Sequence, residues 1–228
     1  MHVIRSLCIA FSTYSRIPVP QVAWTDENRK YSMCFFPLIG AVIGLLLWGW
    51  LALCDVLGFG ALLRGAVGAL LPILVTGGIH MDGYLDTVDA LSSHQTCEKK
   101  LAIMKDANCG AFAVIYGGVY LLAYAGFAYE VFAAGHILLI CPLFVLSRAL
   151  SGLCAVNLPN ARKSGMLCAF TSGVQRRTAT VALTLVGLAA AAGMVWMSPT
   201  AGGMAAAFVV VSALKYRRFA LAQFGGVT

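Results

Sequence analysis

The chain has 228 residues, of which 60% are hydrophobic and only 11% are charged, and its mean hydropathy is +0.85. Apolar blocks of about twenty residues recur along it, which argues against a water-soluble protein. The net charge of +7 comes with no interleaving of basic and aromatic residues, so nucleic-acid binding is not expected. The composition predicts an all-α, polytopic membrane bundle formed by a single domain over residues 1–228.

The first expected element is a helix over residues 2–15. Apolar side chains recur there at helical spacing and form one apolar face: Val3, Ile4, Leu7, Cys8, Phe11 and Tyr14. We expect this helix to lie in the cytoplasmic interface of the membrane rather than to cross it. The prolines of the following RIPVP segment end the helix.

Six membrane spans follow, at residues 35–54, 59–79, 111–131, 137–157, 178–197 and 199–214. Most approach the roughly 20 residues that a helix needs to cross the hydrocarbon core. Gly40 and Gly44 form a GxxxG pair in the first span, which either brings two helices close together or reflects an abundance of small residues. The eight cysteines contain no C-x-x-C pair, so a zinc site is not expected.

The basic residues alternate between the two sides of these spans. They lie before the first span, between the second and third spans, between the fourth and fifth spans, and after the sixth span. The residues before the first span are Arg5, Arg16, Arg29 and Lys30. The positive-inside rule then places both ends of the chain and segment 80–106 on the cytoplasmic side of the cell (inner) membrane. Two arginines fall outside the pattern: Arg64 can snorkel to the outer interface, whereas Arg148, in the middle of a span, is a functional candidate because a charge is costly there.

An acidic run, HMDGYLDTVDAL, lies between the second and third spans. It holds three of the nine acidic residues of the chain, Asp82, Asp86 and Asp89, at the spacing i, i+4, i+7. On a helix these carboxylates face the same way and repel one another, and a divalent cation would relieve the repulsion. Mg²⁺ is typically held by one or two carboxylates, water and substrate phosphates. The run therefore predicts a magnesium site that takes a phosphate ligand, the alternative being a solvated acidic face.

Nearby polar residues extend this candidate site. His80 is a general base, a metal ligand or a polar residue at a helix start, and the sequence does not decide among these roles. In MKDANCG, Asp106 is a further candidate metal ligand and Lys105 a candidate phosphate contact. Arg162, in the loop between the fourth and fifth spans, is another candidate for phosphate binding. Lys105 and Arg162 also fit the positive-inside pattern without any such role.

The acidic run resembles the H-x-D-G-x-x-D-T-x-D-[GA] signature of cobalamin synthases, also called adenosylcobinamide-GDP ribazoletransferases. Other stretches resemble motifs of this family in the same order along the chain: STYSRIPVP, FFPLIGAVIG, MKDANCG, SRAL, ARKSGM and FGGVT. Lys163 stands where an acidic residue is common in the family. The chain stops at Thr228, where the family continues with Gly-Asp and a further membrane helix, so we expect that the C-terminal end is missing.

The resemblance implies a Mg²⁺-dependent phosphotransferase of cobalamin biosynthesis, integral to the membrane. A ribose hydroxyl of α-ribazole, or of its 5′-phosphate, would attack the cobinamide-side phosphate of adenosylcobinamide-GDP and release GMP. We expect the catalytic residues to be His80, Asp82, Asp86 and Asp89. The expected metal ligands are Asp82, Asp86, Asp89 and Asp106. The expected substrate contacts are Arg16, Lys105, Arg148 and Arg162.

Three other functions remain open at this stage, and the oligomeric state is not determined. A CDP-alcohol phosphotransferase would also gather aspartates at a membrane surface, but its D-G-x-x-A-R pattern is absent here. A divalent-cation transporter would suit the acidic cluster and Arg148, although such sites lie at the midplane between repeated halves, and no internal repeat is evident. A structural subunit of a larger assembly is the third.

Overall fold

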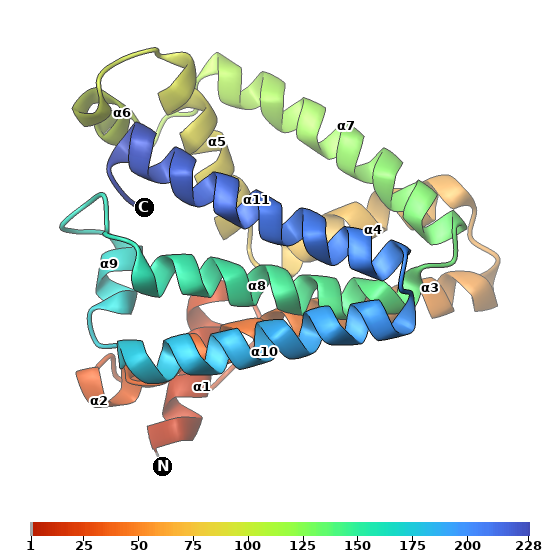
Figure 1. Ribbon diagram of the computed structural model, residues 1–228. Coiled ribbons are helices and arrows are strands. Elements are labelled where there is room, and N and C mark those ends of the chain that lie inside the picture. The colour runs from red at the N-terminus through yellow and green to blue at the C-terminus, as the bar shows by residue number, and fades with distance from the viewer. Residues whose placement is uncertain (1) are drawn as a thin grey trace. The chain divides into compact units, whose positions relative to one another are not determined.

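The computed structural model describes residues 2–228 (Figure 1), and within this range it is helical apart from one isolated bridge between Asn160 and Val227. The all-α prediction is therefore confirmed. The chain divides into two compact units. The first contains the residues up to Leu45 together with Leu138–Thr228, and the second is Leu46–Ile137. The expectation of a single domain stays a prediction.

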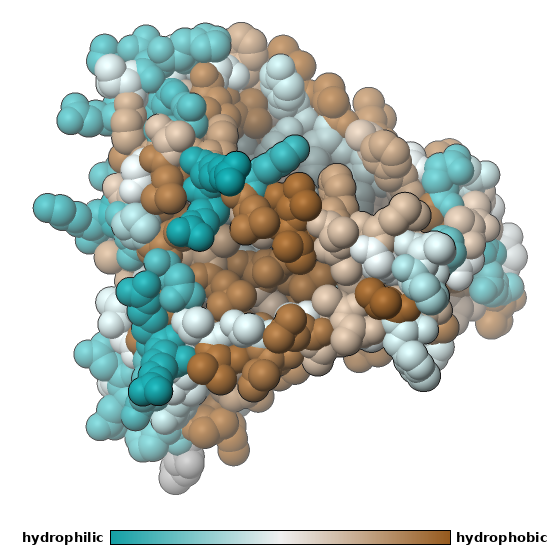
Figure 2. Space-filling view, viewed as in Figure 1, coloured by the Kyte–Doolittle hydropathy of each residue, from teal (hydrophilic) through white to brown (hydrophobic). Residues whose placement is uncertain are grey.

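The first unit is built around three long helices that run side by side in Figure 1: α8 (Ile140–Asn157), α10 (Arg176–Met197) and α11 (Ala201–Phe224). Their shared core includes Leu146, Met194 and Ala206, one residue from each helix. The shorter elements of this unit are α1 (His2–Tyr14), α2 (Asp26–Arg29), η1 (Ser32–Phe35) and α9 (Met166–Thr171). Hydrophobic surface covers the bodies of α8 and α10, whereas hydrophilic surface marks the edge where α2 and α9 lie (Figure 2).

The N-terminal part of α3 (Phe36–Leu57) packs directly on α8. A Cβ added to Gly40 would lie 2.5 Å from the carbonyl oxygen of Phe144, and one added to Gly44 would lie 2.4 Å from the Cα of Cys141. The Cys141 thiol also donates to the Ala41 carbonyl oxygen at 3.7 Å. The structure thus favours the packing interpretation of the GxxxG pair, because both glycines face the backbone of another helix.

Helix α1 confirms the helix predicted over residues 2–15, and it packs on α2 and η1. Ser6 connects these elements: its hydroxyl donates to the Asn28 carbonyl oxygen at 2.6 Å and accepts from the Tyr31 amide at 3.3 Å. The centre of the Tyr14 ring lies 4.8 Å from the centre of the Phe36 ring and 4.8 Å from that of the Phe170 ring. Burial raises the pKa of the Tyr14 hydroxyl far above its usual value, so this side chain stays neutral. The expected interfacial location of α1 stays a prediction.

The second unit holds the rest of α3 with α4 (Ala61–Val75), α5 (Ile79–Ser92), α6 (Cys97–Ile103) and α7 (Ala111–Ala133). Helices α4 and α5 both pack on α7 and are bent by 93° relative to each other. The bend is made by Gly77 (φ 64°) and Gly78 (φ 80°), whose left-handed backbone only glycine adopts at little cost. The bend sets the acidic helix α5 off the axis of α4.

Arg64 has a more specific role than the snorkelling expected from the sequence. Its Nε donates to the Phe59 carbonyl oxygen at 2.9 Å, and a terminal nitrogen donates to the Cys54 carbonyl oxygen at 3.2 Å. Its guanidinium also pairs with Asp55 at 2.5 Å. Arg64 therefore donates to one carbonyl oxygen near the C-terminal end of α3 and to another just after it, where the helix favours a positive charge.

Four helical stretches are long and apolar enough to cross a membrane: Asp26–Leu57, Ala111–Ala133, Ile137–Asn157 and Arg176–Met197. They contain four of the six predicted spans, and the bent pair α4–α5 would make a fifth. Residues 201–214 of the predicted sixth span lie in α11, which is not among these apolar stretches and carries Lys215, Arg217 and Arg218 inside the helix. A helical membrane protein is thus supported, but a count of six spans is not confirmed.

Candidate functional site

The acidic run forms the helix α5 (Ile79–Ser92), which begins after the left-handed residue Gly78. We predicted that Asp82, Asp86 and Asp89 share one face of a helix. The segment is helical, so their spacing places them on the same side of α5. Asp82 is exposed, while Asp86 and Asp89 are half-buried. At about 100° per residue, His80 falls roughly on the opposite side of the helix from these three carboxylates.

Asp89 caps the N-terminus of α7. Its two carboxylate oxygens accept hydrogen bonds from the backbone amides of Gly110 at 2.5 Å and Ala113 at 2.8 Å. The first amides of a helix lack partners within it, and a negative charge is favourable there. A Cβ on Gly110 would lie 2.7 and 2.8 Å from the two oxygens of Asp89. The last aspartate of the acidic run and the glycine that ends MKDANCG therefore fit one another.

Apolar contacts fix α5 against α7. A Cβ added to Gly117 of α7 would lie 2.9 Å from a terminal methyl carbon of Leu85 and 3.7 Å from that of Met81. The rings of Tyr84 and Tyr120 lie 5.3 Å apart. These contacts and the Asp89 cap hold α5 in a defined rotation, so the direction in which its acidic face points is also defined.

Lys105 and Asp106 are exposed in the turn after α6. A carboxylate oxygen of Asp106 accepts hydrogen bonds from the Asn108 backbone amide at 3.0 Å and from its side-chain nitrogen at 2.8 Å. This local turn occupies one oxygen of Asp106. The roles of Lys105 and Asp106 in the site stay predictions.

The donor set of α5 fits magnesium in one specific way. Over residues 2–228, no three side chains of the His, Cys, Asp and Glu types are grouped closely enough to enclose a metal ion. Asp82 and Asp86 are two hard-oxygen side chains one helical turn apart on α5. Two carboxylates suit Mg²⁺, which keeps several waters and binds substrate phosphates, better than they suit a metal that needs a closed protein cage.

The three arginines of the predicted site belong to the first unit. Arg148, on α8, is half-buried and its guanidinium carbon lies 5.9 Å from the centre of the Phe36 ring, within the range of a cation–π contact. Arg162 is half-buried in the loop between α8 and α9, and Arg16 is exposed after α1. Because the acidic helix belongs to the second unit, the meeting of these arginines with the aspartates stays a prediction.

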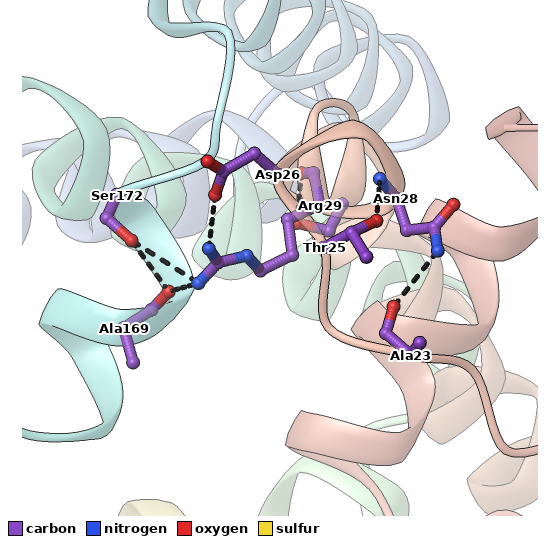
Figure 3. A network of polar contacts seen from close by, with 8 residues as sticks. Ala23, Thr25, Asp26, Asn28, Arg29, Ala169 and Ser172 are labelled. Carbon is purple, nitrogen blue, oxygen red and sulfur yellow. Dashed lines mark hydrogen bonds and ion pairs between the residues drawn. The ribbon is translucent and has the colours of Figure 1, made fainter.

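Arg29 forms a polar network that was not predicted from the sequence. Its side chain is only 13% exposed; its guanidinium pairs with Asp26, donates to the Ala169 carbonyl oxygen and lies 3.3 Å from the Ser172 hydroxyl oxygen (Figure 3). The Gln175 amide also donates to the Lys30 carbonyl oxygen at 2.9 Å. The residues before α3 are thus joined to α9. The positive-inside pattern accounted for Arg29 so fully that no signal in the sequence pointed to this role.

Comparison with known proteins identifies the family. A family model described as cobalamin-5-phosphate synthase matches residues 6–228.

The chain belongs to the cobalamin-5-phosphate synthase family.

Proteins named adenosylcobinamide-GDP ribazoletransferase are similar to this family member. The one from Lachnoclostridium phytofermentans is 41% identical over 227 residues, which is 99% of this chain and 86% of the relative. The one from Desulfitobacterium hafniense is 41% identical over 52% of this chain and 47% of the relative. That from Clostridium botulinum is 33% identical over 50% of this chain and 45% of the relative. No solved structure matches. The resemblance read from the motifs and the assignment to transferases of cobalamin biosynthesis are confirmed.

Proposed function

We propose that this cobalamin-5-phosphate synthase family member joins adenosylcobinamide-GDP to α-ribazole, or to α-ribazole 5′-phosphate, and releases GMP. The observation that carries the proposal is the 41% identity over 99% of the chain to a relative named adenosylcobinamide-GDP ribazoletransferase. In this reaction a ribose hydroxyl oxygen forms a bond to the phosphorus that carries the cobinamide. The bond between that phosphorus and the GMP oxygen breaks, GMP leaves with the electron pair, and the hydroxyl proton passes to a base.

Helix α5 would supply the metal site of this reaction. We assign Asp82 and Asp86 to Mg²⁺, and we assign Asp89, whose two oxygens accept backbone hydrogen bonds, to the cap of α7. Bound there, Mg²⁺ would supply positive charge to the substrate pyrophosphate and to the departing GMP. Asp89 then acts as the residue that fixes the acidic face by capping α7.

The proton of the attacking hydroxyl goes to a carboxylate of α5 or to His80. The helical spacing favours a carboxylate, because His80 projects from roughly the opposite side of α5. Arg148, Arg162, Arg16 and Lys105 are assigned to the phosphate groups of the substrate, where charge and orientation contribute most of the rate in phosphoryl transfer. A planar guanidinium such as that of Arg162 suits a phosphate particularly well, since it can donate two parallel hydrogen bonds.

We also assign the acidic helix and both ends of the described chain to the cytoplasmic side of the cell membrane. The support is the alternation of Lys and Arg between the apolar segments. Polar substrates would then reach α5 from the cytoplasm, and the apolar helices would hold the enzyme in the bilayer.

A reconstituted assay tests this function. The purified chain in liposomes, supplied with Mg²⁺, adenosylcobinamide-GDP and α-ribazole, is expected to release GMP together with the joined cobalamin product. CMP release from a CDP-alcohol lipid would instead support the other membrane phosphotransferase family. Magnesium uptake into the liposomes without any nucleotide, with no GMP formed in the complete mixture, would support a transporter and contradict the proposal.

A further inference from the structure

Val227 pairs through its backbone with the loop that carries Arg162. The Val227 amide donates to the Pro159 carbonyl oxygen at 2.9 Å, and the Ala161 amide donates to the Val227 carbonyl oxygen at 2.8 Å. Asn160 and Val227 thereby form a parallel bridge. The two hydrogen bonds fix the backbone immediately before Arg162, and Val227 itself is only 3% exposed.

Gly226 is fitted closely to this loop. A Cβ at this position would lie 2.2 Å from the Pro159 carbonyl oxygen and 2.8 Å from the Ala161 amide nitrogen. Both are backbone atoms, so no side-chain rotation could make room for a methyl group. Gly225 precedes it with φ 73° and ends α11 in the left-handed conformation, which turns the chain toward the loop.

Helix α9, which follows this loop, is also held. The Asn160 side-chain nitrogen donates to the Thr171 hydroxyl at 3.3 Å, and Arg29 bonds to Ala169 and Ser172 of the following segment. The arc over residues 162–165 thus lies between two anchored ends. This arrangement leaves Arg162 half-buried on a short arc whose starting direction is set by Gly226 and Val227.

We propose that Gly226 and Val227 are positioning residues that hold the Arg162 loop in the conformation that receives a substrate phosphate. A guanidinium that donates two parallel hydrogen bonds must be held in one orientation, and small displacements in such a contact are costly to rate. The backbone clasp made by Val227 provides that constraint. The phosphate part of the inference rests on the proposed function, whereas the clasp itself does not.

Limited proteolysis of the purified full chain in detergent tests the clasp without any activity. Gly226→Ala is expected to raise tryptic cleavage after Arg162 and Lys163 by about tenfold, because two backbone hydrogen bonds that restrain local opening are lost. Gly193→Ala is the matched control, since nothing lies within 4 Å of the added Cβ in α10. Cleavage after Lys99 should be unchanged in both variants. Wild-type cleavage rates at Arg162 and Lys163 in Gly226→Ala would overturn the proposal.

Steady-state kinetics test the positioning role. Gly226→Ala is expected to raise the KM for adenosylcobinamide-GDP by about tenfold while the KM for α-ribazole stays at the wild-type value. A looser loop with an unchanged KM for adenosylcobinamide-GDP would overturn the role. Val227→Pro removes the amide hydrogen that donates to Pro159, and this variant replaces Gly226→Ala if the latter does not fold. If the wild type releases no GMP, the proposed function fails and the proteolysis still decides the clasp.

Discussion

Both carboxylate oxygens of Asp89 accept backbone hydrogen bonds from the start of α7, whereas Asp82 lies exposed on the same face of α5. Asp82 and Asp89 belong to the same acidic motif, but their surroundings differ. The spacing correctly predicted a shared face, because it depends only on the helical repeat. The cap could not be predicted, because Asp89 and Gly110 are 21 residues apart and only the packing of α5 on α7 brings them together.

Removing the Asp89 carboxylate should therefore weaken the fold. Asp89→Ala is expected to lower the free energy of unfolding by about 1–2 kcal/mol, as the loss of other helix caps does. Asp89→Asn keeps one oxygen acceptor and should cost less. Asp82→Ala is the control and should stay within about 0.5 kcal/mol of the wild type, as for other exposed positions. Thermal unfolding in detergent measures all three, and a larger loss for Asp82→Ala would contradict the assignment.

Gly110 provides a second measure of the same contact. Gly110→Ala should destabilise the protein because the added Cβ would push against the Asp89 carboxylate. Combining it with Asp89→Ala should cost less than the sum of the two single changes, since both remove one interaction. Strict additivity of the two losses would show that Asp89 and Gly110 act independently.

Among the helices, hydropathy predicted where most of them lie in the sequence, but it did not predict how they are oriented relative to their neighbours in the chain. The predicted span 59–79 covers α4 and the turn after it, and the 93° bend at Gly77 and Gly78 lies beyond what a hydropathy window detects. Hydropathy also says little about where a helix ends. The predicted sixth span stops at residue 214, before the basic residues, whereas α11 continues through Lys215 and Arg217 to Phe224.

The close packing of α3 on α8 depends on Gly44. Gly44→Ala should lower the free energy of unfolding by about 1–3 kcal/mol, because the new Cβ meets the backbone of Cys141 and the helices must separate. Gly49→Ala, in the same helix with nothing within 4 Å of its Cβ, should be neutral or stabilise by up to about 1 kcal/mol. Equal effects of the two changes in thermal unfolding would contradict a close approach at Gly44.

At the scale of the whole molecule, the helical membrane class and the family could be predicted from composition and motif order. Contacts between distant segments could not. Arg29 and Ala169 are 140 residues apart, and nothing in their local sequence indicates that they meet. The pairing of Val227 with Pro159 and Ala161 could not be predicted either, because backbone hydrogen bonds depend little on residue type.

Membrane orientation is tested with the thiols of the chain. Cys97 and Cys109 are exposed and lie in the segment that we assign to the cytoplasmic side. In right-side-out vesicles an impermeant maleimide should label them only after the membrane is permeabilised. His136→Cys, in the loop between α7 and α8, should be labelled at once. Immediate labelling of Cys97 in sealed vesicles would reverse the assigned orientation.

We assign the phosphotransfer to the acidic face of α5, and a single substitution there shows whether the assignment is right. GMP release from adenosylcobinamide-GDP and α-ribazole is measured at saturating Mg²⁺ for the wild type and for Asp82→Asn, with unfolding midpoints recorded for both. Asp82→Asn is expected to lose turnover while it still inserts into the membrane and unfolds at the wild-type midpoint. Near-normal GMP release by Asp82→Asn would contradict it.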